Sequence, residues 1–559
     1  MNKLVSILLV FCITVPAVFA ADHRPGKAAI ASAHPLATQA GLEIIERGGN
    51  AFDAAVAVSA ALSVVEQYSS GLGGGGFWLL HRASDDFEVL VDGREVAPSA
   101  ATVDMYLDGK GNVVPGRSRE GPLSAGIPGT VAGLAHISET YGRLSLAEAL
   151  APAIALAQDG FPVFDRMRQA LTVKKPVLSR WEAGSVLYYP NGQMPEEGAL
   201  FRQPDLARTL ERVARLGRDG FYRGETASLL VSAVRDHGGI WSETDLAEYE
   251  VREREPIVGH YKGVRIVSCP LPSAGGIGLV NMLNILSGYD LGPLDSASRI
   301  HLTVEAMRRA FRDRSQYLGD PDFIDAPVDR LVHPFYAAGQ RASIRTDRAT
   351  PSASLPDYMG EVNEGNDTTH FSILDAEGNR VAGTQTVNGW FGSGFVAQGT
   401  GLILNNEMDD FSIKPGVENI YRLVGSDANE VRPGKRMLSS MTPTFLESDR
   451  GIAILGTPGG SRIITMVLLS SLAWMDGADA AQMVALPRYH HQFLPDEIKF
   501  EEDALTEEEI LALQAMGHTL NRMNRRYGFM NAITWDFASG KVMSASDPRN
   551  AIGVAFRIY

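Results

Sequence analysis

The sequence predicts a layered α/β protein in which pairs of strands are covered by packed helices. Three segments carry this prediction. Residues 369–387 alternate polar and apolar side chains on both sides of the turn sequence DAEGN, which indicates a hairpin. Residues 451–475 have the pattern of a strand, a glycine-rich turn and an apolar helix. Residues 36–68 contain two alanine-rich helical runs, broken by Gly48, Gly49 and Asn50.

The first element along the chain is an apolar leader at residues 1–20. Lys3 precedes an apolar centre, and the small residue Ala20 ends it, an arrangement typical of a secretory signal peptide. A retained membrane anchor is the alternative, but Pro16 and Ala20 favour cleavage. No later apolar run is long enough to span a membrane, so we expect no stable membrane anchor. The predicted destination is the periplasm of a Gram-negative cell or the outside of the cell.

Composition and charge exclude several classes of protein. Of the 559 residues, 45% are hydrophobic and 21% are charged, as in a soluble globular enzyme. The net charge of −15 argues against nucleic acid as a partner, because phosphate contacts need clustered Lys and Arg. Cleavage of the leader would leave Cys269 as the one remaining cysteine, so no disulfide within the chain is expected. Its apolar neighbours predict a buried thiol.

A run of four glycines, residues 73–76, follows the alanine-rich helices and precedes predicted strands at 77–82 and 87–95. The run contains a GxG pattern. It lacks the Lys–Ser/Thr pair of a phosphate loop, however, and it follows a helix where a dinucleotide fingerprint requires a strand. Close approach of the backbone to a site or to another strand explains the glycines better.

The middle of the chain, residues 130–340, is mostly helical in pattern, most clearly at 144–160 and 300–314. Residues 350–367 are rich in Ser, Pro, Glu, Asn and Gly, which predicts a solvated loop. Residues 530–559 have the pattern of a hairpin-rich edge.

Metal and serine chemistry receive little support from the sequence. The histidines form no HExxH motif, and the neighbours His490 and His491 would face opposite sides of a strand. The cysteine count excludes a thiolate zinc site, so neither a metal nor another cofactor is predicted. Gly392-Ser393-Gly394 is too short for a nucleophile elbow. A Ser/His/Asp triad stays open, because spacing in sequence does not constrain one.

A threonine pair, Thr368 and Thr369, begins the predicted hairpin directly after the solvated loop. Taken alone, such a pair indicates β propensity. A hydroxyl group is a poor nucleophile without a nearby base, and an N-terminal threonine can use its own α-amine, with a pKa near ~7.7–8.0. Cleavage of the bond between Asp367 and Thr368 would give Thr368 such an amine.

Around this pair the sequence resembles the γ-glutamyltransferase (γ-glutamyl transpeptidase) family of N-terminal-nucleophile hydrolases. The resemblance rests on DTTHFS at 367–372, LNNEMDDFS at 404–412, KPGV at 414–417, GKRMLSSMTPT at 434–444, PGGSRII at 458–464, DGREVAP at 92–98 and PGTVAG at 128–133. It covers essentially the whole mature chain. It implies an αββα sandwich formed jointly by two self-cleaved chains, a large subunit at 21–367 and a small catalytic subunit at 368–559.

The resemblance also implies a role for individual residues. Thr368 would be both the self-cleavage residue and the nucleophile, with Thr386 supporting it. Gly459 and Gly460 would form the oxyanion hole with their backbone N–H groups, which agrees with glycines at the start of a predicted helix.

The substrate-binding residues follow in the same way. The implied ligands of the substrate α-carboxylate are an arginine, whose guanidinium fork suits a carboxylate, and two serines: Arg94, Ser439 and Ser440. The implied ligands of the α-ammonium group are Asp410, Glu407 and Asn388.

Two further features bear on specificity. The tract between Phe411 and Leu438 resembles a lid loop with Tyr421 as its gating aromatic residue, which implies a covered pocket and disfavours large polymeric substrates. After Asn388 the family pattern has polar residues, whereas this chain has Gly389-Trp390. A tryptophan near the mouth of the pocket would change the preference for acceptor or leaving group.

The implied reaction takes the γ-glutamyl group of glutathione or a similar amide, forms a γ-glutamyl-enzyme, and passes the group to water or to an amino acid or dipeptide. A glutaryl or cephalosporin acylase and a poly-γ-glutamate hydrolase are alternatives on the same scaffold. Asp410 and Glu407 argue against the acylase, because a glutaryl substrate has no α-ammonium. An inactive γ-glutamyl-binding protein is the non-enzymatic alternative, disfavoured by the intact nucleophile and oxyanion glycines.

Overall fold

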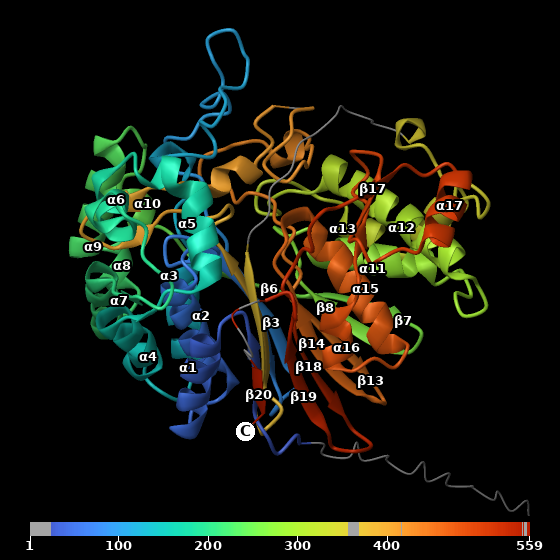
Figure 1. The fold of residues 1–559 in the computed structure, drawn as a ribbon, viewed down its shortest axis with the longest axis horizontal. Helices are drawn as coiled ribbons and strands as arrows, with labels where there is room; N and C mark the ends of the chain where they lie inside the picture. The colour runs from blue at the N-terminus through green and yellow to red at the C-terminus, as the bar shows by residue number, and fades with distance from the viewer. Residues whose placement is uncertain (1–23, 356–367, 415, 551, 553–555, 559) are drawn as a thin grey trace, which may run out of the picture.

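Two antiparallel sheets pack face to face between two layers of helices (Figure 1). The computed structural model describes residues 24–355, 368–414, 416–550, 552 and 556–558. The layered α/β prediction is confirmed, and the order helix, sheet, sheet, helix is the one that the family resemblance implies. The predicted signal peptide, residues 1–20, and Asp367 lie outside the described residues.

The first sheet has seven strands and contains the predicted hairpin at its centre. Strands β9 and β10 pair antiparallel, with Thr369 opposite Gln385, so the hairpin prediction is confirmed. In order across the sheet the strands are β20 (Phe556–Ile558), β1 (Ala29–Ser32), β9 (Thr369–Leu374), β10 (Arg380–Thr386), β2 (Gly75–Arg82), β3 (Phe87–Gly93) and β6 (Arg252–Arg254).

The second sheet has six strands and supports the turn that holds Gly459 and Gly460. In order these are β19 (Val542–Ser546), β18 (Asn531–Asp536), β14 (Gly451–Gly456), β13 (Thr444–Ser448), β8 (Val264–Ser268) and β7 (Ile257–Tyr261). Shorter strands form small separate pairs or sheets: β4 (Phe161–Pro162), β5 (Leu200–Phe201), β11 (Val396–Ala397), β12 (Leu402–Ile403), β15 (Tyr489–His490), β16 (Ile498–Phe500) and β17 (Leu520–Arg522).

One helical layer covers the outer face of the seven-stranded sheet (Figure 1). It comprises α1 (Pro35–Glu46), α2 (Ala51–Val65), α3 (Thr130–Tyr141), α4 (Leu146–Asp159), α5 (Asp165–Leu178), α6 (Glu182–Tyr188), α7 (Pro204–Leu216), α8 (Asp219–Tyr222), α9 (Gly224–Asp236) and α10 (Glu243–Ala247). The Asn50 side chain accepts hydrogen bonds from the backbone N–H groups of Phe52 and Asp53. This cap explains why α2 begins directly after the glycine pair.

The other layer lies on the far side of the six-stranded sheet (Figure 1). It comprises α11 (Gly275–Leu286), α12 (Ser296–Tyr317), α13 (Val328–Leu331), α14 (Pro334–Arg341), α15 (Ile463–Met475), α16 (Ala480–Ala485) and α17 (Glu507–Ala515). Helix α15 follows β14 through a glycine-rich turn, as the sequence predicts.

Alternation along the strands divides the apolar residues between two large cores. On β2, Trp78 and Leu80 join the core under the first helical layer, whereas Phe77 and Leu79 join the core between the sheets. The glycine run precedes these residues, and a Cβ on Gly74 would lie 1.9 Å from the Thr386 carbonyl oxygen. The close approach predicted for these glycines is therefore confirmed, and the approaching backbone belongs to β10.

Other sequence predictions can be compared directly with the fold. Cys269 is buried, and burial raises the pKa of its thiol well above the usual value. His490 accepts or donates a hydrogen bond with Thr465 Oγ1 at 2.8 Å, and His491 pairs with Asp496, so both have structural partners. The predicted C-terminal hairpin is present as β18 and β19, whereas β20 joins the other sheet beside β1.

Candidate active site

The two threonines of the pair face opposite sides of the seven-stranded sheet. Thr369 lies on the helical side, where its hydroxyl donates to Glu66 Oε2 at 2.7 Å. Thr368 lies on the other side and is 5% exposed, with its Oγ1 3.5 Å from Thr386 Oγ1. His370 has the same orientation as Thr368, and its ring nitrogen is 2.8 Å from Thr384 Oγ1. The alternation of a strand therefore separates the two threonines.

His370 is not placed to act as a base for Thr368. The ring is fully buried, and burial lowers its pKa to about 3, so the imidazole is neutral at physiological pH. Its two nitrogens contact Thr384 Oγ1 and Ser372 Oγ. The base that the chemistry needs must therefore come from elsewhere.

Thr386 ends β10 and stands beside the predicted nucleophile. Its Oγ1 also accepts a hydrogen bond from the Asn388 backbone N–H at 2.8 Å. Asn388 has a positive φ of 71°, which turns the chain away from the sheet directly after the strand. The Asn388 side chain donates to the Asn406 carbonyl oxygen at 3.0 Å, so the turn and the Glu407 segment are tied together.

Gly459 and Gly460 lie in the turn between β14 and α15, with φ values of 144° and 58°. These angles favour glycine. A Cβ on Gly460 would lie 2.2 Å from the Tyr421 ring, and one on Gly459 would lie 2.6 Å from Met466 Cε. Neither backbone N–H donates a hydrogen bond to any part of the chain that the structure describes. Two free donors at this turn are suited to an oxyanion.

Arg94 and two acidic residues form a buried ion cluster next to this turn. The Arg94 guanidinium pairs with Glu407 Oε1 and, at 2.8 Å, with Asp410 Oδ2. Its Nε donates to the Met437 carbonyl oxygen at 3.1 Å. Glu407 and Asp410 belong to the short helix η4 (Glu407–Asp410), and Arg94 follows β3. Arg94, the predicted carboxylate ligand, is thus paired with two of the residues predicted to bind ammonium, Glu407 and Asp410.

Burial sets the protonation behaviour of this cluster. It raises the pKa of Asp410 to about 6, although Arg94 acts in the opposite direction. The pKa of Glu407 is raised well above its usual value for the same reason. Glu95, next to Arg94 in sequence, is also fully buried, which raises its pKa to about 7. The acids thus retain protons at a pH where exposed carboxyl groups would be ionised.

A small cavity connects the nucleophile to the charged cluster. It is lined by Arg314, Thr368, Thr386, Asn388, Glu407, Asp410, Tyr421, Leu423, Ser439, Ser440, Met441, Gly460 and Ile463. Arg94 is not among the described residues that line it. Four buried atoms from the lining side chains have no hydrogen-bond partner within the described chain: Arg314 Nε, Asn388 Oδ1, Glu407 Oε2 and Ser440 Oγ. Two acceptors, a hydroxyl and an N–H donor are therefore without a partner.

Tyr421 covers one side of this cavity. Its hydroxyl donates to the Asn388 carbonyl oxygen at 2.9 Å, and its ring packs against Gly460. Ser439 lies on another wall, where its Oγ accepts from the Met441 backbone N–H at 3.1 Å. Trp390 is half-buried against the first core and is not among the described residues that line the cavity.

Two groups of histidine and glutamate lie close enough together to hold a metal: His301, Glu305 and His518, and His81, Glu88 and Glu447. Arginines already contact the carboxylates in both groups. Glu305 accepts from Arg309 Nη1 at 2.6 Å, and Glu88 accepts from Arg265 Nη1 at 3.0 Å. These groups fit ion pairs better than a metal site.

Sequence reasoning missed several polar residues around the cavity. Arg314 belongs to α12 and lines the cavity. Helix α12 contains several arginines, and its sequence does not indicate which of them reaches the cavity. Glu95 follows Arg94 directly, and Asn419 donates to Asp410 Oδ1 at 3.0 Å from within the lid segment. Glu66, on the opposite side of the sheet, bonds Thr369 and could have been suspected, since an acid at the end of an apolar helix needs a polar partner.

The fold is that of an N-terminal-nucleophile hydrolase, with two antiparallel sheets between helical layers and a buried threonine at the start of a central strand. A family model described as Gamma-glutamyltranspeptidase matches residues 37–556, and the chain belongs to this family. No helix in the described ranges is long and apolar enough to cross a membrane.

Individual relatives agree with this assignment. The chain is 42% identical over 493 residues to "Glutathione hydrolase proenzyme" of Pseudomonas sp. (strain A14), covering 87% of this chain and 85% of the relative. It is 41% identical over 532 residues to the protein of the same name from Escherichia coli (strain K12), with coverage of 94% and 91%. The solved structure of cephalosporin acylase from Bacillus halodurans superposes with a TM-score of 0.83 at 28% identity, covering 95% of both chains.

Proposed function

We propose that the protein is a self-cleaving enzyme that hydrolyses γ-glutamyl amides, glutathione among them, and transfers the γ-glutamyl group to amino acids or dipeptides. The observation that carries this proposal is the cavity that brings Thr368 and Gly460 together with Glu407 and Asp410. Relatives named glutathione hydrolase proenzymes support both the substrate and the processing.

Processing begins with attack of Thr368 Oγ1 on the carbonyl carbon of Asp367. The peptide C–N bond breaks, the threonine nitrogen becomes a free amine, and an ester joins Asp367 to the Thr368 oxygen. Water hydrolyses this ester and leaves Asp367 as a C-terminal carboxylate. Signal cleavage and this step give a large subunit at 21–367 and a small subunit at 368–559, which together form one αββα unit because each sheet contains strands from both.

Catalysis uses the amine that processing creates. The α-amine of Thr368 takes the proton from its own hydroxyl, and Oγ1 attacks the γ-carbonyl carbon of the substrate. The backbone N–H groups of Gly459 and Gly460 bind the negative charge that develops on the carbonyl oxygen. The amine proton passes to the departing nitrogen, and the C–N bond breaks to leave a γ-glutamyl ester on Thr368. Water or the amine of an acceptor then releases the γ-glutamyl group.

Recognition of the glutamyl group depends on the charged end of the cavity. Glu407 and Asn388 offer acceptors to the α-ammonium, with Asp410 adding negative charge beside them. Ser439 and Ser440 offer hydroxyl groups to the α-carboxylate, and Arg94 supplies positive charge close by. Thr386 supports the nucleophile through its hydroxyl. Tyr421 covers the pocket, which favours small γ-glutamyl compounds over a polymer.

A glutaryl or cephalosporin acylase is the second candidate, and the similarity to a cephalosporin acylase structure favours considering it. A glutaryl group carries the same terminal carboxylate but no ammonium. Such a substrate would leave Glu407 Oε2 and Asn388 Oδ1 buried without a partner, which is unfavourable. The unpartnered acceptors therefore favour a γ-glutamyl substrate.

The proposed location is outside the inner membrane, in the periplasm or beyond the cell. The apolar leader at residues 1–20 supports export.

Wild type and Thr368→Ala, each purified, test this proposal on a denaturing gel and with two chromogenic anilides. We expect two bands and release of the γ-glutamyl anilide for wild type, and one band without release for the variant. One full-length wild-type band would contradict self-cleavage. Two bands with release from a glutaryl anilide, but none from the γ-glutamyl anilide, would establish the acylase instead.

A further inference from the structure

Residues 343–355, here called the arm, are the last described segment before the predicted cleavage site. Met516, in the proposed small subunit, accepts a hydrogen bond from the Ala349 N–H through its carbonyl oxygen at 2.8 Å. Glu305, on α12 of the proposed large subunit, accepts one from the Thr350 N–H through Oε1 at 2.9 Å. The arm is therefore bonded to residues of both proposed subunits.

Ser352 lies near the end of the arm and is fully buried. Its backbone N–H donates to Asp496 Oδ2 at 2.7 Å, and its hydroxyl donates to the Phe493 carbonyl oxygen at 2.7 Å. The Arg308 guanidinium donates to the same hydroxyl and also pairs with Asp496. Ser352, Arg308 and Asp496 thus bond to one another in a closed set, here called the clamp.

Asp496 is the acid of the clamp and belongs to the proposed small subunit. His491 Nε2 lies 3.2 Å from its Oδ1. Burial acts to raise the pKa of Asp496, but hydrogen bonds from His491 and Arg308 outweigh it and hold the pKa well below its usual value. Asp496 is therefore ionised at physiological pH, which strengthens its bonds to the Ser352 N–H and to Arg308.

Two histidines hold an earlier point of the arm. His301 Nε2, on α12, lies 2.7 Å from the Arg345 carbonyl oxygen. A carbonyl oxygen can only accept, so this nitrogen carries a proton. The other ring nitrogen, Nδ1, lies 2.8 Å from His518 Nε2 in the proposed small subunit. The arm is thus tied to both proposed subunits here as well as at Ser352.

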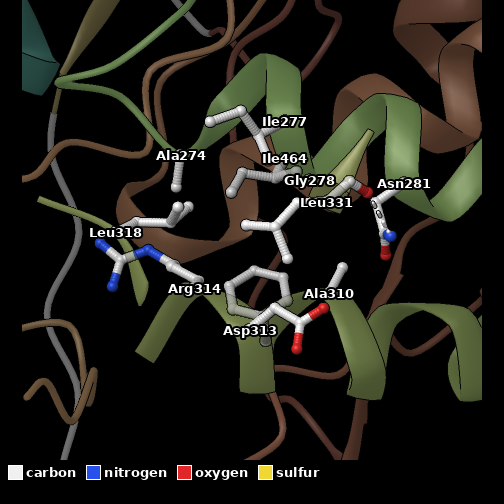
Figure 2. A pocket seen from close by; sticks show the side chains of 11 residues that line it. Ala274, Ile277, Gly278, Asn281, Ala310, Asp313, Arg314, Leu318, Leu331 and Ile464 are labelled. Carbon is white, nitrogen blue, oxygen red and sulfur yellow. Dashed lines mark hydrogen bonds between the residues drawn. The ribbon is translucent and has the colours of Figure 1, made fainter. Parts of the chain in front are cut away.

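Helix α12 is suited to hold the arm because it is packed on two opposite faces. Glu305 and Arg308 are one turn apart and bond to the arm. The opposite face carries Ala310, which closes a small apolar pocket with Ile277 of α11 and Ile464 of α15 (Figure 2). This packing fixes the helix from which the Arg308 side chain reaches the clamp.

We propose that the clamp positions the connection between the two subunits for self-cleavage, and that Ser352 and Asp496 are positioning residues for the attack by Thr368. This inference rests on the proposed function. Residues 356–367 join the arm to Thr368, which directly precedes the paired strand β9. Holding the connection at both ends limits its conformations. The entropic cost of bringing the Asp367 carbonyl carbon to Thr368 Oγ1 is then smaller.

Loss of the full-length chain during cell-free synthesis, followed on a denaturing gel, measures the rate of self-cleavage. For Asp496→Ala we expect this rate to fall about tenfold, the scale of a hydrogen bond to a charged group. The kcat/KM of the cleaved enzyme for γ-glutamyl anilide should stay unchanged. Ser352→Ala should slow self-cleavage less, because it keeps the N–H bond to Asp496. Asp503→Ala is the matched control, since Asp503 pairs with Arg526 at the surface, and it should cleave at the wild-type rate.

Cutting the connection separates positioning from a structural role. A site for a specific protease, inserted after Gly360, lets the connection be cut when the protease is present during synthesis. Mass spectrometry then distinguishes chains that begin at the inserted site from chains that begin at Thr368. Once the connection is cut, wild type and Asp496→Ala should self-cleave at equal rates, because the clamp no longer holds the peptide before Thr368.

The outcomes separate this inference from the proposed function. A wild type that stays full-length contradicts the proposed function itself. A wild type that cleaves no faster than Asp496→Ala contradicts the clamp alone. A slow Asp496→Ala with a reduced kcat/KM after cleavage, or with a difference that persists when the connection is cut, indicates a structural role and also overturns the inference. If Asp496→Ala does not fold, Asp496→Asn, which keeps one acceptor oxygen, carries the same comparison.

Discussion

The nucleophile end of the cavity and its charged end are held in place by different forces. Thr368 and Thr386 lie at the ends of neighbouring strands, and the pairing of Thr369 with Gln385 fixes their separation. Arg94 and Asp410 come from separate segments and are joined by a buried ion pair. Strand register thus fixes the distance between Thr368 and Thr386. The ion pair of Arg94 and Asp410 depends instead on the balance between the cost of burial and the attraction of opposite charges. Variants at the two ends should therefore fail in different ways.

The largest effect is expected for Arg94→Gln, which would leave Glu407 and Asp410 buried without their cation. We expect a loss of about 3–5 kcal/mol in the free energy of unfolding. Arg314→Gln should cause no such loss, because Arg314 has no acidic partner in the described chain. Urea denaturation in a Thr368→Ala background, where the chain stays uncut, measures both. Equal losses would show that the two arginines do not differ as described.

Gly460→Ala should come next. Its Cβ would lie 2.2 Å from the Tyr421 ring, so the turn would have to move and its N–H would leave the oxyanion position. We expect kcat to fall about 10²–10³-fold, the usual cost of one oxyanion donor. Gly339→Ala is the control, since a Cβ there meets nothing within 4 Å. An unchanged kcat in Gly460→Ala would remove Gly460 from the oxyanion hole.

Thr386→Val should have a smaller effect on the rate. It removes the hydroxyl that accepts from the Asn388 N–H and lies beside Thr368 Oγ1. We expect kcat to fall about tenfold, equivalent to about 1.4 kcal/mol, which is within the range for a single hydrogen bond. Thr386→Ser keeps the hydroxyl and should retain most of the activity. A serine variant as slow as the valine variant would show that the methyl group, not the hydroxyl, matters.

The last effect is expected from Glu95 and appears only as a dependence of stability on pH. Burial raises its pKa from 4.5 to about 7, so the folded protein keeps a proton that the unfolded chain has released. The stability that Glu95 contributes is therefore present below about pH 4.5 and is lost as the pH rises through about 7. Melting temperatures between pH 5 and 8 should fall less for Glu95→Gln than for wild type. Equal slopes would contradict the raised pKa.

Secondary-structure elements around the site could be predicted from the sequence, but the pairing of its charged side chains could not. Alternation predicted the hairpin that begins at Thr369, and the glycine run predicted a close approach that β10 provides. The sequence did not indicate that Arg94 bonds to Glu407 and Asp410, or that Arg314 lines the cavity. Ion pairing depends on which side chains meet after the layers pack, and local patterns carry no information about this.

The position of the new chain end tests the central claim most directly. The claim is that Thr368 becomes an N-terminal nucleophile. N-terminal sequencing of the smaller chain of the mature wild type should give Thr-Thr-His-Phe-Ser, while Thr368→Ala should stay a single chain. A smaller chain that begins at another residue, or cleavage at this position in Thr368→Ala, would contradict the account.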